Sequence, residues 1–228
     1  MRIYMYFAPV ALAAWIALLA MPILSLASDP PPNIILILAD DQGWTGTSVQ
    51  MDPTIADSRS DYYQTPNLES LAAKGMRFSQ AYASAPVCSP TRASIQTGKS
   101  PAQLQMTDIF IGPDIINSNR FQNQYMGLPL TPPIALGPMS NDHLTIAEYV
   151  KSSHPNYVTA HYGKWHLGDA PNTSATANGF DFSANRSGNP NVDPKSIFTL
   201  TTLTNNFMRD RVNGEDPFFV QLSHRAPH

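Results

Sequence analysis

Residues 33–39 of the chain are NIILILA, and residues 40–43 that follow are DDQG. A continuous apolar run of this length, rich in β-branched residues, is typical of a parallel strand that is covered on both faces. It therefore predicts a central strand of a parallel sheet. The two acids Asp40 and Asp41 stand where open α/β sheets present their ligand crevice, outside the carboxyl ends of the strands. The stretch thus predicts an α/β fold with a polar site at the end of its first strand.

Helix and strand patterns alternate on the C-terminal side of this strand. A helix is expected to begin at Thr65 and to end at Gly75, because a proline occupies its first turn and a glycine follows its last. Further helices are predicted at residues 90–97, 145–152 and 195–211, and strands at residues 76–82, 157–161 and 217–223. This alternation indicates a layered α/β fold with a mainly parallel sheet flanked by helices. Residues 99–142 and 170–193 lack a sustained period and are expected to form loops.

Composition and charge exclude several classes of protein. Of the 228 residues, 43% are hydrophobic, 10% are aromatic and 14% are charged. This is enough apolar material for a sizeable core, and it argues against disorder. The net charge is -3, with 14 Lys and Arg against 17 Asp and Glu, so no strong positive field attracts nucleic acid. A single cysteine excludes an intrachain disulfide framework and multi-cysteine zinc or iron–sulfur sites.

The first 27 residues have the pattern of an export signal. Arg2 gives a short positive segment, residues 10–20 are apolar, and Ser25-Leu26-Ala27 is a small-x-small cleavage site. Because the apolar stretch approaches the ~20 residues that span a bilayer, an uncleaved membrane anchor is the alternative. Residues 28–32 form a stiff, proline-rich spacer. We therefore expect an exported protein, periplasmic or secreted, that meets a membrane only through its signal segment.

The stretch CSPTRASIQTG at residues 88–98 carries the clearest chemical signal. Pro90 suits the first turn of a helix, so Cys88 is expected beside a helix N-terminus, where free N–H groups and the helix dipole favour negative charge. Arg92 can turn back toward the same point. These surroundings stabilise an anion at position 88, either a thiolate or an oxyanion. On these residues alone, the alternative is a partly buried free thiol.

This string resembles the sulfatase signature, in which Cys-x-Pro-Ser/Thr-Arg is followed at a fixed distance by Thr-Gly. Further blocks match the same family in the expected order, at residues 33–43, 65–78, 157–166 and 217–228. The resemblance implies an alkaline-phosphatase-like fold, with residues 33–228 as the N-terminal portion of a sulfatase catalytic domain. Family members continue with an Asp-Asn metal pair, another lysine and a smaller C-terminal domain. Residues 28–228 by themselves, as a truncated domain, are therefore expected to bind Ca²⁺ weakly and to show little sulfatase turnover.

The resemblance implies a metal site at Asp40, Asp41 and Cys88. Carboxylate oxygens suit Ca²⁺, with Mg²⁺ as the alternative, and the absence of further cysteines disfavours zinc. Adjacent residues of a strand point to opposite faces, so both acids reach one ion only if the strand breaks there, which Gly43 permits. Without the family, two acids at the end of a strand are commonly a helix cap or a turn.

The resemblance also implies the catalytic groups. A formylglycine-generating enzyme would oxidise Cys88 to formylglycine, whose hydrate supplies the nucleophile. Arg92 and Lys164 would hold the sulfate oxygens, and His166 or His228 would protonate the leaving group. Lys164 and His166 are two residues apart, so in an extended chain they project from one face and can clamp one anionic group.

Three alternatives stay open at this stage. A phosphonate or phosphate monoester hydrolase of the same superfamily shares the paired acids and sometimes the cysteine motif. An inactive, truncated fragment is a non-enzymatic alternative. His224 competes with His228 for the role of the histidine that follows the last strand. The substrate is expected to be a sulfate ester, and a sulfated polysaccharide is one candidate for an exported enzyme.

Overall fold

The computed structural model describes residues 30–110, 137–185, 189 and 191–228, so the predicted export signal lies outside the described residues. Residues 31–228 form one unit of the chain. Within the described part, no helix has the length and apolarity needed to cross a bilayer. The elements in chain order are β1 (Ile34–Asp40), α2 (Pro66–Lys74), α3 (Cys88–Thr97), α4 (Pro101–Leu104), α6 (Ile146–Ser153), β2 (Val158–Gly163), η2 (Thr176–Asn178), β3 (Phe182–Ala184), η3 (Pro194–Ser196), α7 (Ile197–Arg211) and β4 (Phe218–Pro227).

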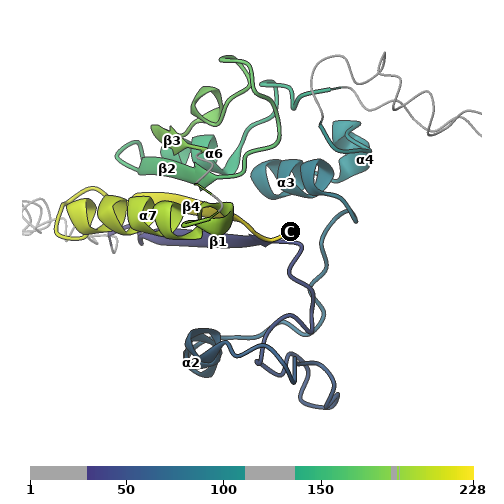
Figure 1. Cartoon of the computed structure of the whole chain (residues 1–228). Helices are drawn as coiled ribbons and strands as arrows, with labels where there is room; N and C mark the ends of the chain where they lie inside the picture. Colours follow the sequence, from purple (N-terminus) through teal and green to yellow (C-terminus); the bar gives the residue numbers. More distant parts are fainter. Residues whose placement is uncertain (1–29, 111–136, 186–188, 190) are drawn as a thin grey trace, which may run out of the picture. The chain divides into compact units, whose positions relative to one another are not determined.

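A four-stranded sheet in the order β1-β4-β2-β3 organises these elements (Figure 1). Every strand pair is parallel, which confirms the predicted sheet. The prediction that β1 is a central strand covered on both faces is wrong for the described residues. β1 lies at the edge of this sheet, and Ile35 and Ile37 are 50% and 60% exposed because only the opposite face of the strand packs on the core.

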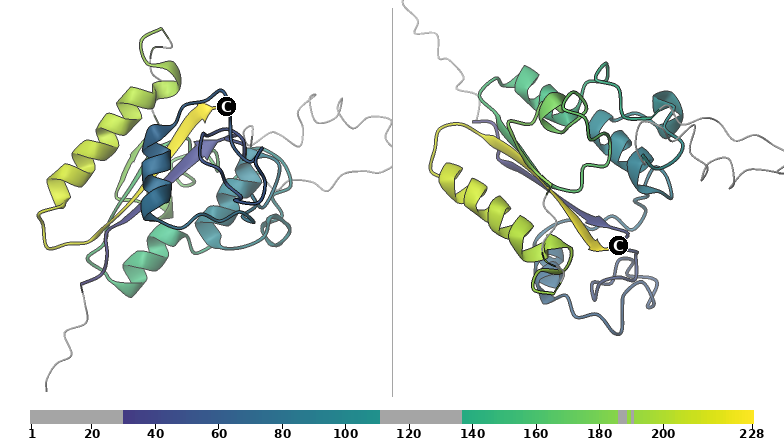
Figure 2. Two further views of the ribbon diagram at one scale, coloured as in Figure 1. Left: turned by 90° about the horizontal axis from the view of Figure 1, so that it is seen from below. Right: turned by 45° about the horizontal axis from the view of Figure 1, so that its top comes forward.

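Helices cover the two faces of the sheet. Alternate residues of β4 point to opposite faces, so Phe218 and Val220 pack with α7, whereas Phe219 packs with α3 and α6. Figures 1 and 2 show α7 along one face of the sheet and α6 on the other. The fold is therefore the layered α/β arrangement that the alternating sequence pattern predicts.

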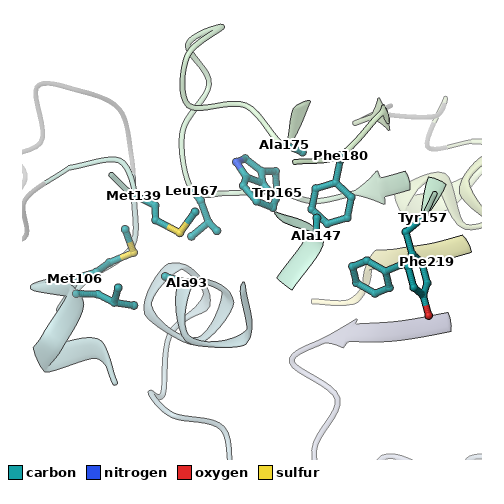
Figure 3. Packing of buried hydrophobic residues seen from close by; sticks show 11 residues of the cluster. Ala93, Met106, Met139, Ala147, Tyr157, Trp165, Leu167, Ala175, Phe180 and Phe219 are labelled. Carbon is teal, nitrogen blue, oxygen red and sulfur yellow. The ribbon is translucent and has the colours of Figure 1, made fainter. Parts of the chain in front are cut away.

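The core on the α3 and α6 side also holds the segment that follows β2. Trp165 and Leu167 of that segment are buried beside Ala93 of α3 and Phe180 (Figure 3). The Trp165 and Phe180 ring centroids are 6.0 Å apart in an edge-to-face arrangement. The Trp165 indole also donates from Nε1 to the carbonyl of Thr173 at 2.9 Å. Because Trp165 and Leu167 are held in the core, the backbone at the neighbouring residues 164 and 166 is held as well.

Most predicted elements are present, with some corrections. The helices predicted at residues 65–75, 90–97, 145–152 and 195–211 correspond to α2, α3, α6 and α7. The strand predicted at residues 76–82 is wrong, because this segment is irregular and its side chains Met76, Phe78 and Tyr82 are exposed. A β-rich composition does not form a strand without a neighbour to bond. The first predicted loop contains α4 and the second contains η2 and β3, and part of each loop lies outside the described residues.

Gly163, the last residue of β2, is expected to tolerate no side chain. Its φ is +112°, and a Cβ there would lie 1.9 Å from the carbonyl oxygen of Ser223. Gly163→Ala should therefore destabilise the whole protein by roughly 2 kcal/mol or more, from left-handed strain plus overpacking. Gly75→Ala is the control, because its φ is -128° and the nearest atom would be 3.4 Å away. Equal unfolding midpoints in urea for the two variants would contradict the close approach of β2 and β4.

Candidate active site

Asp40 and Asp41 lie where β1 stops. The break expected at the two acids falls at Asp41, whose φ is +60°. Opposite this point β4 is irregular, because Leu38 pairs with Ser223 while Asp40 pairs with Pro227. Extra residues in one strand bend it and redirect its side chains. The bend brings the end of β4 back to β1, where the His228 backbone N–H donates to the Asp40 carbonyl at 3.1 Å.

Cys88 is the first residue of α3 and is partly buried. Pro90 stands in the first turn of this helix, as its fixed φ favours. One helical turn after Cys88, the buried Arg92 donates from Nη2 to Asp40 Oδ1 at 3.0 Å and from Nη1 to the Lys164 carbonyl at 2.5 Å. Arg92 thus connects α3 to the end of β1 and to the residue that follows β2.

Lys164 follows directly after β2 and is buried. Its Nζ lies 2.6 Å from Asp40 Oδ2 and 3.4 Å from Cys88 Sγ. Its backbone N–H donates to the Ser223 carbonyl at 2.9 Å, next to the close approach at Gly163. The tight pairing of β2 and β4 therefore fixes the backbone of Lys164, and Asp40 holds its ammonium group.

Asp40 is an ionised acid held between two cations. It is 5% exposed, and each carboxylate oxygen accepts a hydrogen bond from a different cation, Arg92 or Lys164. Burial acts to raise the pKa of Asp40, but the hydrogen bonds and charges of Lys164 and Arg92 outweigh it and hold the pKa below its usual value. Each carboxylate oxygen keeps a further lone pair after these bonds, so the carboxylate can still act as a ligand.

His166 is half-buried and has a φ of +59°, so its stretch is not the simple extended chain that was predicted. Its backbone carbonyl accepts a hydrogen bond from the Ser89 hydroxyl at 2.8 Å. Burial, with the charges of Lys164 and Arg92, lowers the pKa of the His166 imidazole below its ordinary value. His166 and Lys164 still line one cavity, together with Asp40 and His228.

His228 lies beside the paired acids. Its Nδ1 contacts Asp41 Oδ2 and is 3.9 Å from Asp40 Oδ2. Ligand atoms of Asp40, Cys88 and His228 all lie within 4.8 Å of one another, so these three residues can hold a metal ion. Asp41, which the sequence placed among the ligands, contacts His228 instead of joining this group. His224, the competing histidine, is not among the residues that line the cavity.

Two cavities meet at Asp40. One of about 330 Å³ is lined by Cys88, Arg92 and both acids, among others. The other, of about 320 Å³, is lined by Asp40, Lys164, His166 and His228, and also by residues that the sequence analysis did not single out: Asp169, Asn185, Lys195 and Arg225. The first three of these lie outside the blocks that resemble the family, so no sequence pattern pointed to them as site residues. Arg225 lies next to His224 in the last predicted block, which was its only signal.

The chain resembles known proteins over most of its length. A family model described as Sulfatase matches residues 32–228. The chain is 32% identical over 166 residues to N-acetylgalactosamine-6-sulfatase of Mus musculus, a match that covers 73% of this chain and 28% of that protein. It is 35% identical over 159 residues to arylsulfatase A of Bos taurus, covering 70% of this chain and 25% of that protein. The chain thus spans about a quarter of the length of these relatives.

Solved structures share the fold. The chain resembles Ps i-CgsB in complex with k-i-k-neocarrahexaose with a TM-score of 0.61 and 26% identity, covering 86% of this chain and 45% of that one. It resembles BT4656 in complex with its substrate D-glucosamine-2-N,6-O-disulfate with a TM-score of 0.57 and 25% identity, covering 86% of this chain and 35% of that one.

Proposed function

The chain belongs to the sulfatase family, and on this premise we propose that the whole protein hydrolyses sulfate esters after Cys88 has been oxidised to formylglycine. The observation that carries the proposal is the position of Cys88 at the start of α3, with its Sγ 3.4 Å from the Lys164 ammonium. One hydroxyl of the aldehyde hydrate at position 88 would attack sulfur as the bond between sulfur and the ester oxygen breaks and the alcohol leaves. The second hydroxyl would then lose its proton to a neighbouring base, the C=O double bond would re-form, and the C–O bond to sulfate would break, which releases sulfate and restores the aldehyde. An ordinary serine has no second hydroxyl on the same carbon, so it could not release sulfate in this way.

Arg92 and Lys164 are proposed to hold the sulfate oxygens. Both are buried, and both are positioned by Asp40, so they need little rearrangement when an anion arrives. Charged donors that are already in place stabilise the charge that develops in a transition state far better than mobile ones. Asp40 keeps these two side chains apart and directed to the space beside Cys88.

A divalent cation fits the acids of this site. Asp40 retains free lone pairs, Asp41 is exposed at the same strand end, and hard carboxylate oxygens are preferred by Ca²⁺ and Mg²⁺. We propose that Asp40, Asp41 and the oxygen of the modified residue 88 hold the cation. The cation would neutralise negative charge on the sulfate group. Ca²⁺ is our first choice for its identity, and Mg²⁺ the alternative.

His228 is proposed as the proton donor to the leaving alcohol, because its imidazole lines the same cavity as Lys164 and His166 and its Nδ1 contacts the Asp41 carboxylate. His228→Ala should lower kcat for alkyl sulfates by about 10²–10⁴, and much less for 4-nitrophenyl sulfate, whose leaving group needs no proton. Comparing kcat across leaving groups of rising pKa measures this, with His154→Ala on the surface as the control. An equal loss for all leaving groups would remove His228 from this role.

Parallel turnover of two aryl esters tests the reaction itself. The whole protein, produced together with a formylglycine-generating enzyme, is expected to hydrolyse 4-nitrophenyl sulfate much faster than 4-nitrophenyl phosphate. Faster phosphate hydrolysis would instead assign it to the phosphate and phosphonate hydrolases of the superfamily.

The natural substrate is proposed to be a sulfated carbohydrate. One structural neighbour is described with a neocarrahexaose and another with a disulfated glucosamine as its substrate, and both share the fold over most of this chain. The export signal expected at residues 1–27 agrees with a substrate outside the cytoplasm, periplasmic or secreted. Release of inorganic sulfate from sulfated saccharides, followed by ion chromatography, tests this class.

A further inference from the structure

The cavity of about 320 Å³ beside Lys164 and His166 has a second wall that the proposed reaction does not use. Lys195, Arg225, Asn185 and Asp169 form this wall. A volume near the lower end of the roughly 300–1,000 Å³ of small-ligand sites suits one sugar ring with its substituents.

The two cations of this wall come from different elements. Lys195 lies in the turn before α7 with a φ of +57°, a conformation that few residues other than glycine adopt. Arg225 lies in the part of β4 where the pairing with β1 is irregular. Its Nη2 donates to Asn185 Oδ1 at 2.5 Å, and its Nε is buried with no hydrogen-bond partner among the described residues. The fold thus directs a cation from each of two elements into one cavity.

Lys195 and Arg225 differ from the cations beside Cys88 in their ion pairs with carboxylates. Arg92 and Lys164 are both bound to Asp40. Among residues 30–110, 137–185, 189 and 191–228, neither Lys195 nor Arg225 forms an ion pair with a carboxylate. Asp169 lines the same cavity, but it is exposed and a single charge, so the wall keeps a net positive charge.

We infer that Lys195 and Arg225 bind a second anionic group of the substrate, a sulfate or a carboxylate on the same sugar or on its neighbour. The inference rests on the proposed function, because the first anionic group is the sulfate ester held by Arg92 and Lys164. Guanidinium and ammonium groups bind sulfate and carboxylate oxygens through charge-assisted hydrogen bonds. Asp169 is placed to accept a hydrogen bond from a sugar hydroxyl. The preferred substrates are therefore sugars with two anionic groups.

Matched sugars test this selectivity in the whole, formylglycine-containing protein. N-acetylglucosamine-6-O-sulfate has one anionic group, glucosamine-2-N,6-O-disulfate adds a sulfate, and a disaccharide that links 6-sulfated hexosamine to a glucuronate adds a carboxylate, with galacto isomers beside each. The wild-type protein should favour at least one doubly anionic sugar in kcat/KM. Lys195→Gln with Arg225→Gln should lower that preference roughly 10- to 100-fold, the range expected when hydrogen bonds to charged groups are lost. Lys74→Gln with Arg209→Gln removes the same two charges from exposed positions outside the cavity and should leave the preference intact.

Calorimetric measurement of sugar binding separates the test of the second anion site from the test of the proposed reaction. Binding of the same sugars to the Cys88→Ala protein, with and without the two glutamines, measures recognition without turnover. Loss of turnover for every sulfate ester, with the binding difference retained, would contradict the proposed reaction and leave the second anion site standing. Equal kcat/KM for singly and doubly anionic sugars in the wild-type protein, or an unchanged preference in the variants, would overturn the inference. Lys195→Arg retains the charge and should keep most of the preference.

Discussion

Cys88→Ala is expected to abolish sulfate ester hydrolysis by the whole protein. Alanine cannot become formylglycine, so the variant lacks the proposed nucleophile, while Arg92, Lys164 and Asp40 should keep their mutual contacts. Removal of a covalent nucleophile in another hydrolase costs about 10⁶ in kcat, and a loss of this order is expected here. Initial rates on 4-nitrophenyl sulfate measure the effect.

Ser94→Ala is the matched control for that substitution. Ser94 belongs to the same helix, α3, and each of the two substitutions removes one heavy atom from the side chain. Ser94→Ala therefore measures any general effect of such a loss on the helix. We expect the control to keep near-normal turnover and both variants to have near-normal melting temperatures. Near-normal sulfatase activity in folded Cys88→Ala would show that the reaction does not pass through residue 88.

Arg92→Ala should lower kcat by about 10²–10³, the usual cost of one lost oxyanion donor. It should also lower the melting temperature, because Arg92 is 4% exposed and its loss removes one of the two cations that neutralise the buried Asp40. Paired measurements of kcat and thermal unfolding separate the two effects. Arg209→Ala, an exposed arginine on α7, serves as the control.

Arg92→Lys distinguishes charge from geometry. Lysine keeps the positive charge but cannot reach both Asp40 and the Lys164 carbonyl with a planar fork. Partial recovery of stability with little recovery of kcat would support a role in holding sulfate oxygens. Arg92→Ala with wild-type kcat and reduced stability would leave Arg92 with a structural role only.

The helices and the parallel sheet could be predicted because their signals are local. Pro66 and Pro90 mark first turns, and the apolar runs of β1, β2 and β4 are long enough to identify. The position of β1 in the sheet could not be predicted, because an apolar strand does not say which strand it pairs with. For the same reason residues 76–82 have strand-like composition without forming a strand in the described structure.

The residues of the candidate site could be predicted from the sequence, but the contacts between their side chains could not. Adjacent acids, a cysteine before a helix and a Lys-x-His string are local patterns, and the fold brings them together at the ends of β1 and β2. The contact of Asp41 with His228 depends on the irregular pairing of β1 with β4, which no local pattern encodes. Lys195 reaches the cavity from a turn 31 residues after Lys164 in the sequence, and its approach depends on tertiary packing alone.

The most direct test of the central claim is the chemical state of residue 88. Trypsin releases it in the peptide Phe78–Arg92, which contains no other site of cleavage. After production of the whole protein together with a formylglycine-generating enzyme, mass spectrometry with hydrazide trapping should find this peptide with the mass of formylglycine and as the hydrazone. An unmodified thiol, under conditions that convert a control sulfatase completely, would contradict the account.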